Sequence, residues 1–433
     1  MFAHYLDLAF RSLKRNPVLT VLMVLALGLG IGATITTLTV LRLLSGDPIP
    51  QKSAQLFYPR IDPYPADGFV PGQSKPSRTM PYTDAMNLLH ARKGYRQAVI
   101  ALTPAKVTPQ AVGRHPFFTH GVMATADFFS MFEVPFRYGS GWSAGDDDNR
   151  AHVAVIAGFL NDKLFDGGNS VGKTVRINEH DYRIVGVLKH WAVQPRFYAL
   201  ALGGRNYGDG DAVFLPLQAA RADKMNPQNV NCWSATDIHD LETAPCEWVG
   251  LWVELLNPSA AAAYKTFLSN YVRQQMTLGR FHRPEVALPN LMQWLRDEKV
   301  VPDDVRLQTG LAFGFLLICV VNTVGLLLAK CLRRSREIGV RRALGATQRT
   351  IFAQFMVESA IVGLVGGVLG LVFAFLGLWG IRHQPAQYAS LAHLDVVMFA
   401  FTFVVALVAS LIAGLLPAWR ACVVAPAPQL KAS

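Results

Sequence analysis

The segment from Gly167 to Thr174, GGNSVGKT, matches the pattern G-x-x-x-x-G-K-[ST] of loops that cradle nucleotide phosphates. In such loops a buried strand precedes the glycines and a helix follows, so that backbone amides and the helix N-terminus face the phosphates. Here the alternating run TVRIN at 174–178 follows and indicates a strand. We therefore interpret this segment as a turn that does not bind nucleotide.

Other residues with chemical potential give no catalytic or metal centre. The run Asp146, Asp147, Asp148 and Asn149 carries oxygen ligands suited to a hard cation, but an exposed acidic turn is the better interpretation. The motifs H-E-x-x-H and C-x-x-C do not occur, and G-x-S-x-G does not fall on a strand-to-helix turn. The sequence predicts no metal site, no cofactor in this chain and no enzyme activity of its own.

Five cysteines sort by position along the chain. Cys319, Cys331 and Cys422 lie in or beside long apolar runs, whereas Cys232 and Cys246 lie in the more polar middle of the chain. In an oxidising compartment these two cysteines could form a disulfide closing a loop of about 15 residues, worth roughly 3 kcal/mol. Two free buried thiols are the alternative, because spacing alone does not bring the Cα atoms within reach.

Composition indicates a membrane anchor joined to a large water-exposed domain. The chain is 51% apolar and 16% charged, with a mean hydropathy of +0.25. Its net charge is +11, yet residues 45–306 hold 27 Lys and Arg against 26 Asp and Glu. Most of the positive excess therefore flanks the apolar runs, which argues against a nucleic-acid partner and sets the topology instead.

The predicted fold class is a membrane protein with four transmembrane α-helices and a large extracytoplasmic α+β domain inserted between helices 1 and 2. The spans are predicted at 18–44, 307–329, 351–380 and 396–416. The domain covers 45–306, with a β-rich subdomain at about 140–245. The remaining segments are an amphipathic helix at 1–17, a short external loop at 381–395 and a tail at 417–433. Both termini are expected in the cytoplasm.

The segment 330–350 between the second and third spans carries seven basic residues and one acidic residue. It is predicted to be a cytoplasmic loop, because Lys and Arg stay on the inner side of the membrane. Good helix formers predict a helix from Ser335 to Leu344, ended at Gly345, and Thr347 can cap the next helix. Such a helix suits docking to a cytosolic partner, whereas a solvated basic turn that only sets topology is the alternative.

Small residues predict close packing between the spans. Gly28 and Gly32 form a small-xxx-small pair in the first span. In the third span, two overlapping pairs on neighbouring faces are formed by Gly363, Gly366, Gly367 and Gly370. The same span contains Glu358, which needs a partner or water at that depth. A functional role in the bundle interior and a snorkelling interfacial glutamate are both open.

The chain resembles ABC transporter permeases of the MacB and FtsX type. The strongest match is SREIGVRRALGATQRTIFAQFMVESA, which is similar to the R-E-I-G-[IV]-R-[KR]-A-L-G-A motif that leads into a glutamate-containing span. The opening LAFRSLKRNPVLTVL and the ending PAWRACVVAPAPQL also resemble that family. The stretch from Asp127 to Leu188 resembles the MacB-type extracytoplasmic domain, in which the false phosphate loop is a shared turn.

The resemblance implies a location in the bacterial inner membrane, with the large domain in the periplasm. It also implies a permease dimer, of two copies or with a sister permease, bound to two ATPase subunits that carry ATP and Mg²⁺. We expect these ATPases to be separate chains. The ATPase-coupling residues implied are Arg336, Glu337, Ile338, Gly339, Val340, Arg341, Arg342 and Leu344.

ATP-driven closure of the ATPases would then move the spans and the periplasmic domain, for export of a periplasmic or membrane substrate. A periplasmic adaptor and an outer-membrane channel are further partners of such a system, besides the surrounding membrane lipid. Two alternatives stay open: extraction of lipoproteins or lipids, and regulation of a cell-wall enzyme without transport.

Overall fold

The computed structural model describes residues 9, 11–110, 113–237, 240–384 and 387–423. The chain divides into two compact units, one formed by residues 46–300 and the other by the segments before and after them. We refer to these as the domain unit and the membrane unit, and describe each by itself. Residues 1–8 and 10 of the predicted amphipathic helix and the last ten residues of the predicted tail lie outside the described residues.

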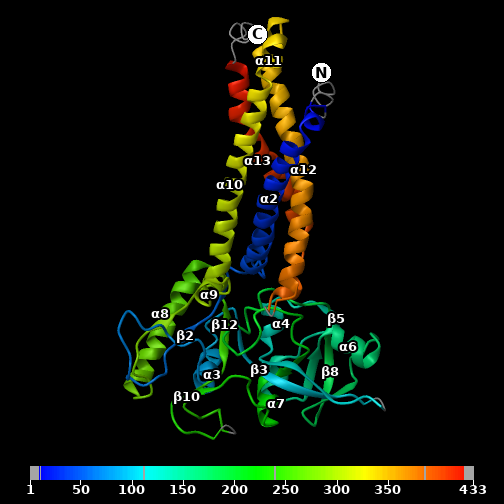
Figure 1. Cartoon of the computed structure of the whole chain (residues 1–433). Helices are drawn as coiled ribbons and strands as arrows, with labels where there is room; N and C mark the ends of the chain where they lie inside the picture. Colours follow the sequence, from blue (N-terminus) through cyan, green and yellow to red (C-terminus); the bar gives the residue numbers. More distant parts are fainter. Residues whose placement is uncertain (1–8, 10, 111–112, 238–239, 385–386, 424–433) are drawn as a thin grey trace. The chain divides into compact units, whose positions relative to one another are not determined.

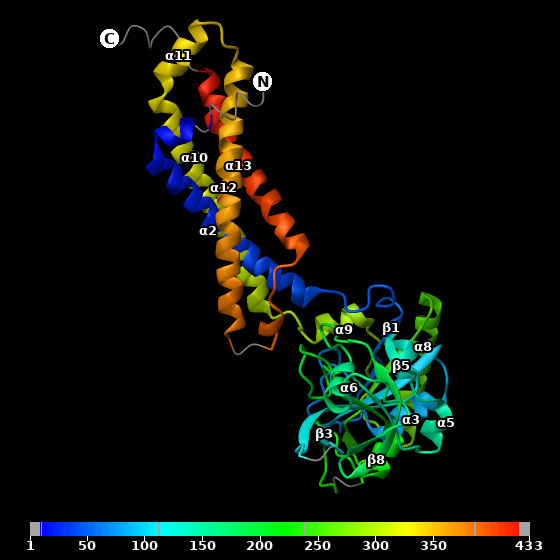
Figure 2. The same ribbon diagram turned by 90° about the vertical axis from the view of Figure 1, so that its right-hand side faces the viewer.

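In the described part of the membrane unit, four helices are long and apolar enough to cross a bilayer (Figures 1 and 2). They are α2 (Pro17–Ser45), α10 (Asp303–Arg333), α12 (Gln348–Arg382) and α13 (Val396–Val423). The short elements α11 (Ser335–Ala343) and η1 (Ala389–Leu391) join them. Each long helix continues beyond the predicted span at one or both ends, and α13 runs through Pro417 into the segment expected to be tail.

The predicted glycine pairs lie where the helices approach most closely. A Cβ atom at Gly32 would come within 2.5 Å of Phe373, and one at Gly370 within 2.8 Å of Ile31. Gly28 and Gly366 likewise face the opposite helix, with Cβ distances of 3.1 Å to Leu369 and 3.2 Å to Leu27. The glycines therefore let α2 and α12 pack backbone to backbone, as expected where lipid gives no hydrophobic drive for association.

The second pair in α12, Gly363 and Gly367, packs against α13 instead of α2. A Cβ atom at Gly367 would lie 2.8 Å from that of Ala406, and one at Gly363 would collide with Ser410, both on α13. Neighbouring faces of α12 therefore hold two different helices. The prediction missed Gly377, which packs against Thr36 of α2.

The domain unit is built on one nine-stranded mixed sheet with the order β1-β12-β3-β4-β9-β6-β8-β5, and β7 pairs with β3 and β8. The sheet strands are β1 (Leu56–Phe57), β3 (Arg96–Thr108), β4 (Phe117–Ala124), β5 (Phe136–Gly139), β6 (Val153–Ile156), β7 (Thr174–Ile177), β8 (His180–Leu188), β9 (Val213–Pro216) and β12 (Gly250–Glu254). Two small sheets pair β2 (Arg60–Ile61) with β13 (Val286–Ala287) and β10 (Asn231–Cys232) with β11 (Cys246–Glu247).

Seven helices of the domain unit are described, and several of them pack on the large sheet. They are α3 (Tyr82–His90), α4 (Asp127–Met131), α5 (Ala144–Asp148), α6 (Gly158–Phe165), α7 (Leu217–Ala222), α8 (Pro258–Thr277) and α9 (Leu291–Asp297). One core cluster joins Leu88 of α3, Leu268 of α8 and Val253 of β12. Burial of such side chains is the main stabilising contribution to a domain of this size.

The β-rich subdomain expected at about 140–245 is not separate in the structure. Its strands β6 and β9 continue the same sheet as β3, β4 and β12, which lie outside that range. The prediction did not include β3, the longest strand, which runs through Pro104 without a break. On one side of β3, β12 pairs only as far as Ile100 and β7 pairs only from Val107 onward. Pro104 lies between these two pairings, where this side of β3 is an edge, so its missing amide hydrogen is tolerated.

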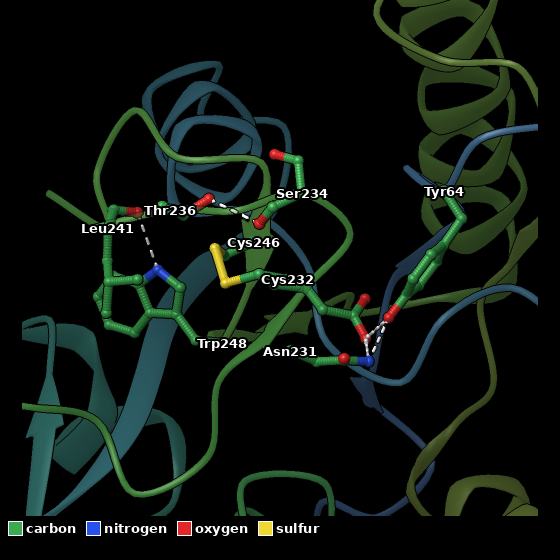
Figure 3. The surroundings of a disulfide bond; sticks show 9 residues. Tyr64, Asn231, Cys232, Ser234, Thr236, Leu241, Cys246 and Trp248 are labelled. Carbon is green, nitrogen blue, oxygen red and sulfur yellow. Dashed lines mark hydrogen bonds between the residues drawn. A yellow bond between two sulfur atoms is a disulfide. The ribbon is translucent and has the colours of Figure 1, made fainter. Parts of the chain in front are cut away.

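Cys232 and Cys246 form a disulfide, with their Cα atoms 4.0 Å apart (Figure 3). The bond joins the paired strands β10 and β11 at the base of a loop. Close by, the indole N–H of Trp248 donates to the carbonyl of Leu241 at 3.1 Å, which ties the loop to the sheet core. Cys319, Cys331 and Cys422 are buried free thiols.

The prediction of an exposed acidic turn at 146–149 is wrong for Asp147, which is buried. The segment forms α5, whose Ser143 cap and Asp146 make a reciprocal capping box. Asp147 is buried and accepts hydrogen bonds from the Ala126 amide at 2.6 Å and the Trp142 indole at 2.8 Å. Burial raises the pKa of Asp147 to about 7.

Candidate coupling surface of the membrane unit

Helix α11 lies at one end of the four-helix bundle (Figures 1 and 2). It begins directly after Arg334, where α10 has ended, and its last residue is Ala343, one residue earlier than predicted. Gly345 follows with φ +99°, a left-handed conformation that ends the helix at little cost for glycine. Thr347 then caps α12 by accepting from the Thr350 amide at 3.3 Å. The end of α11 and the start of α12 are therefore both determined by the local sequence.

The inner face of α11 packs on its own bundle. Ile338 is buried in a cluster with Ile351 and Phe355 of α12 and with Ala418 and Ala421 of α13. Gly339 is buried beside it. The Ile338 side chain fills the space between two spans, so it is not exposed for direct contact with an ATPase. It instead ties α11 to those spans.

Polar bonds reinforce this attachment. Arg341 contacts Glu337 at 2.6 Å and donates to the Gln354 side chain at 3.1 Å, and Arg342 donates to the backbone carbonyl of Cys422 at 3.2 Å. Arg342 therefore links α11 directly to the end of α13. Of the predicted coupling residues, Glu337, Arg341 and Arg342 are half-buried and engaged within the chain.

The outer face of α11 is formed by Arg336, Val340 and Leu344, which we call the outer stripe. These residues are four apart, so they follow one face of the helix. Val340 is 46% exposed and Leu344 82% exposed, and Arg336 is also exposed. An exposed leucine and valine on a basic helix outside the apolar spans give a small surface suited to contact with another protein.

A buried charged group lies beneath α11. Glu358 of α12 is 1% exposed and forms an ion pair with Lys330, in the last turn of α10. Ser12 also donates to Glu358, at 2.7 Å, and Arg334 donates to Ser12 at 2.5 Å. Arg334 lies 4.0 Å from the second oxygen of Glu358. These four residues, which we call the charge cluster, connect the N-terminal segment, α10, α12 and the start of α11.

The charge cluster decides between the two interpretations of Glu358. The carboxylate points into the bundle and meets a fully buried ammonium group, so it does not snorkel to the surface. Its partners Ser12, Lys330 and Arg334 were not predicted from the sequence. Lys330 had a visible signal, since it closes a long apolar run, but its pairing with Glu358 needs the fold.

The phosphate-loop pattern has the reverse of the geometry that binds nucleotide. It follows helix α6 and precedes strand β7, and Gly167 and Gly172 adopt φ values of +78° and +87°. Ser170 is buried and donates to Asn161 at 2.5 Å, so the segment is a packed turn. No helix N-terminus follows to receive a phosphate.

Comparison with known proteins places both units in families. The model of the MacB-like periplasmic core domain matches residues 20–265, and that of the FtsX-like permease C-terminal domain matches residues 309–426. The pyoverdine export ATP-binding/permease protein PvdT of Pseudomonas aeruginosa is 28% identical over 70% of this chain and 41% of its own length. The uncharacterized ABC transporter permease YvrN of Bacillus subtilis is 23% identical over 70% of this chain and 68% of its own length.

Among solved structures, the periplasmic region of MacB from Actinobacillus actinomycetemcomitans covers 56% of this chain and 92% of that one, at 13% identity and a TM-score of 0.36. The chain spans about two fifths of the length of the PvdT relative it matches. The two family matches and the four apolar helices together identify a multi-pass membrane protein with a large extracellular domain. The chain belongs to the MacB/FtsX-type family of ABC transporter permeases.

Proposed function

We propose that this permease transmits ATP-driven motion from an ATPase partner across the inner membrane to its periplasmic domain, for export of a periplasmic or membrane substrate. In this proposal α11 and both termini are cytoplasmic, and the ATPase dimer binds ATP and Mg²⁺. A second permease, of the same or a related sequence, completes the complex. Export is supported by the similarity to PvdT, which is a pyoverdine export ATP-binding/permease protein.

The observation that carries the proposal is the two-sided character of α11. Its outer stripe is open to a partner, whereas its inner face is fixed to α12 and α13 by Ile338 and Arg342. A push on the outer stripe must therefore move at least two spans, because the packed interface resists local deformation. The charge cluster extends this attachment to α10.

Motion of the spans has a covalent route to the domain unit. Helix α2 ends at Ser45, directly before the first residue of that unit, and α10 begins shortly after its last residue. The domain is thus held between the two helices that the charge cluster and the α2–α12 packing couple to α11. ATP can shift the position of the domain unit only if the ATP-bound ATPases bind two conformations of the permease with different affinities.

The test is permease-stimulated ATP hydrolysis by the complex purified with its ATPase and reconstituted in liposomes. We expect Leu344→Asp to remove most of the stimulation, because it places a charge in the contact, while insertion and thermal unfolding stay unchanged. The matched control is Leu278→Asp, which alters an exposed leucine of the domain unit. Equal stimulation by Leu344→Asp and the parent complex would remove the coupling role of the outer stripe.

A further inference from the structure

Three potential metal ligands converge on one side of the domain unit. They are His152, directly before β6, His180, the first residue of β8, and Asp223, the residue after α7. His152 Nε2 lies 3.0 Å and His180 Nδ1 3.3 Å from the same carboxylate atom, Oδ1 of Asp223. All three ligand atoms lie within 4.8 Å of one another. This group was not predictable from local sequence, because its members are distant along the chain.

These distances suit a tetrahedral ion. Zinc binds nitrogen and oxygen at about 2.0–2.2 Å, which places neighbouring ligand atoms roughly 3.4 Å apart. The two histidine–aspartate separations are already near that value, and only the separation between the imidazoles needs to shorten. Both histidines are half-exposed, so their rings have room to rotate. The set of two imidazoles and one carboxylate is typical of zinc and chemically similar divalent ions.

The carboxylate is held in place by an outer hydrogen bond. The Tyr182 hydroxyl donates to Oδ2 of Asp223 at 2.5 Å, which leaves Oδ1 directed at the histidines. Tyr182 is buried, and a phenolic hydroxyl is protonated at neutral pH, so it remains a donor to this carboxylate. Outer-shell partners of this kind orient metal ligands and tune their affinity.

The backbone also positions the ligands before any ion binds. The His152 carbonyl accepts from the Arg183 amide at 2.9 Å, and His180 pairs with Ile177 in the β7–β8 hairpin. The Asp223 amide donates to the Ala219 carbonyl at 3.0 Å, at the end of α7. Three separate elements therefore present their ligands from hydrogen-bonded positions, which lowers the ordering cost of binding.

We propose that His152, His180 and Asp223 bind one divalent transition-metal ion of the zinc type, with a fourth coordination position open to solvent. The ion would pin the start of β6, the β7–β8 hairpin and the end of α7 to one another. Because it binds only the folded arrangement, it stabilises the domain unit by mass action. This inference does not depend on the proposed coupling mechanism.

The experiment uses the full chain in detergent, purified through a tag without histidine and stripped with a chelator. Zn²⁺ titration by calorimetry should give one site per chain, and Co²⁺ should produce the visible absorption of a low-symmetry four-coordinate ion. Zn²⁺ should also raise the unfolding temperature. The variants His152→Ala and His180→Ala should each weaken Zn²⁺ binding at least tenfold, and Tyr182→Phe by about 10- to 100-fold.

The matched control is His282→Ala, which removes an exposed histidine elsewhere in the domain unit. It should leave affinity, absorption and unfolding temperature unchanged. Circular dichroism of the metal-free variants separates loss of the site from loss of the fold. The proposal is overturned if the parent chain binds no Zn²⁺, or if the double variant His152→Ala/His180→Ala binds it as tightly as the parent.

Discussion

Removing one member of the buried ion pair in the charge cluster should destabilise the membrane unit strongly. Lys330→Met keeps the length and apolar stem of the side chain but deletes the ammonium group that meets Glu358. Ser12 and Arg334 remain, yet Arg334 lies 4.0 Å away, so the buried carboxylate loses its closest counter-charge. Breaking one partner of a buried pair costs about 3–5 kcal/mol. We expect a loss of unfolding free energy of that order.

The double variant Lys330→Met/Glu358→Met should recover most of this loss, because a buried apolar pair of similar volume needs no counter-charge. The measurement is a double-mutant cycle by denaturant titration in mixed micelles. Arg42→Gln is the control: its pair with Asp395 spans 3.5 Å with both side chains about half exposed, and should contribute about 0–1 kcal/mol. A Lys330→Met effect no larger than that of Arg42→Gln, or a double variant no more stable than Lys330→Met alone, would show that the buried ion pair does not stabilise the membrane unit in this way.

Three further predictions concern packing, the disulfide and pH. Gly370→Leu should crowd α2 and lower bundle stability by about 1–3 kcal/mol, whereas Gly380→Leu, with open space around it, should be neutral in the same titration. Replacing Cys232 and Cys246 by serine should destabilise the domain unit by about 3 kcal/mol, seen as a lower unfolding temperature that reductant no longer changes. Burial raises the pKa of Asp147 from 3.8 to about 7. Between these pH values the folded domain keeps a proton that the unfolded chain loses, so the stabilisation that this proton gives is lost as pH rises from about 4 to 7. Asp147→Asn should flatten that part of the stability–pH curve, and an unchanged slope would contradict the buried, protonated carboxyl.

Features with local or periodic signals were predictable from the sequence. The four spans follow from apolar length, and the turn after α11 follows from Gly345 and Thr347. The small-xxx-small spacing identified the glycines, although it could not say which helix each pair would meet. In α12, Gly366 faces α2 and Gly367 faces α13.

Features that depend on pairing between distant segments were not predictable. Strand β3 contains Pro104, which only the arrangement of its neighbours makes acceptable. The charge cluster brings Ser12 to Glu358, 346 residues apart in sequence. The inner face of α11 was also missed, because Ile338 and Val340 are equally apolar and only tertiary packing buries the first and exposes the second.

Transmission of motion across the membrane requires α11 and the domain unit to lie on opposite sides of it, with α11 on the cytoplasmic side. The free cysteines are buried and the other two form a disulfide, so single engineered cysteines can be labelled without removing native ones. Leu344→Cys reports on the outer stripe, and Phe118→Cys on a side chain of β4 that is 77% exposed. With a membrane-impermeant maleimide on intact spheroplasts, we expect labelling of Phe118→Cys alone, and of both variants after permeabilisation. Labelling of Leu344→Cys in intact spheroplasts would contradict it.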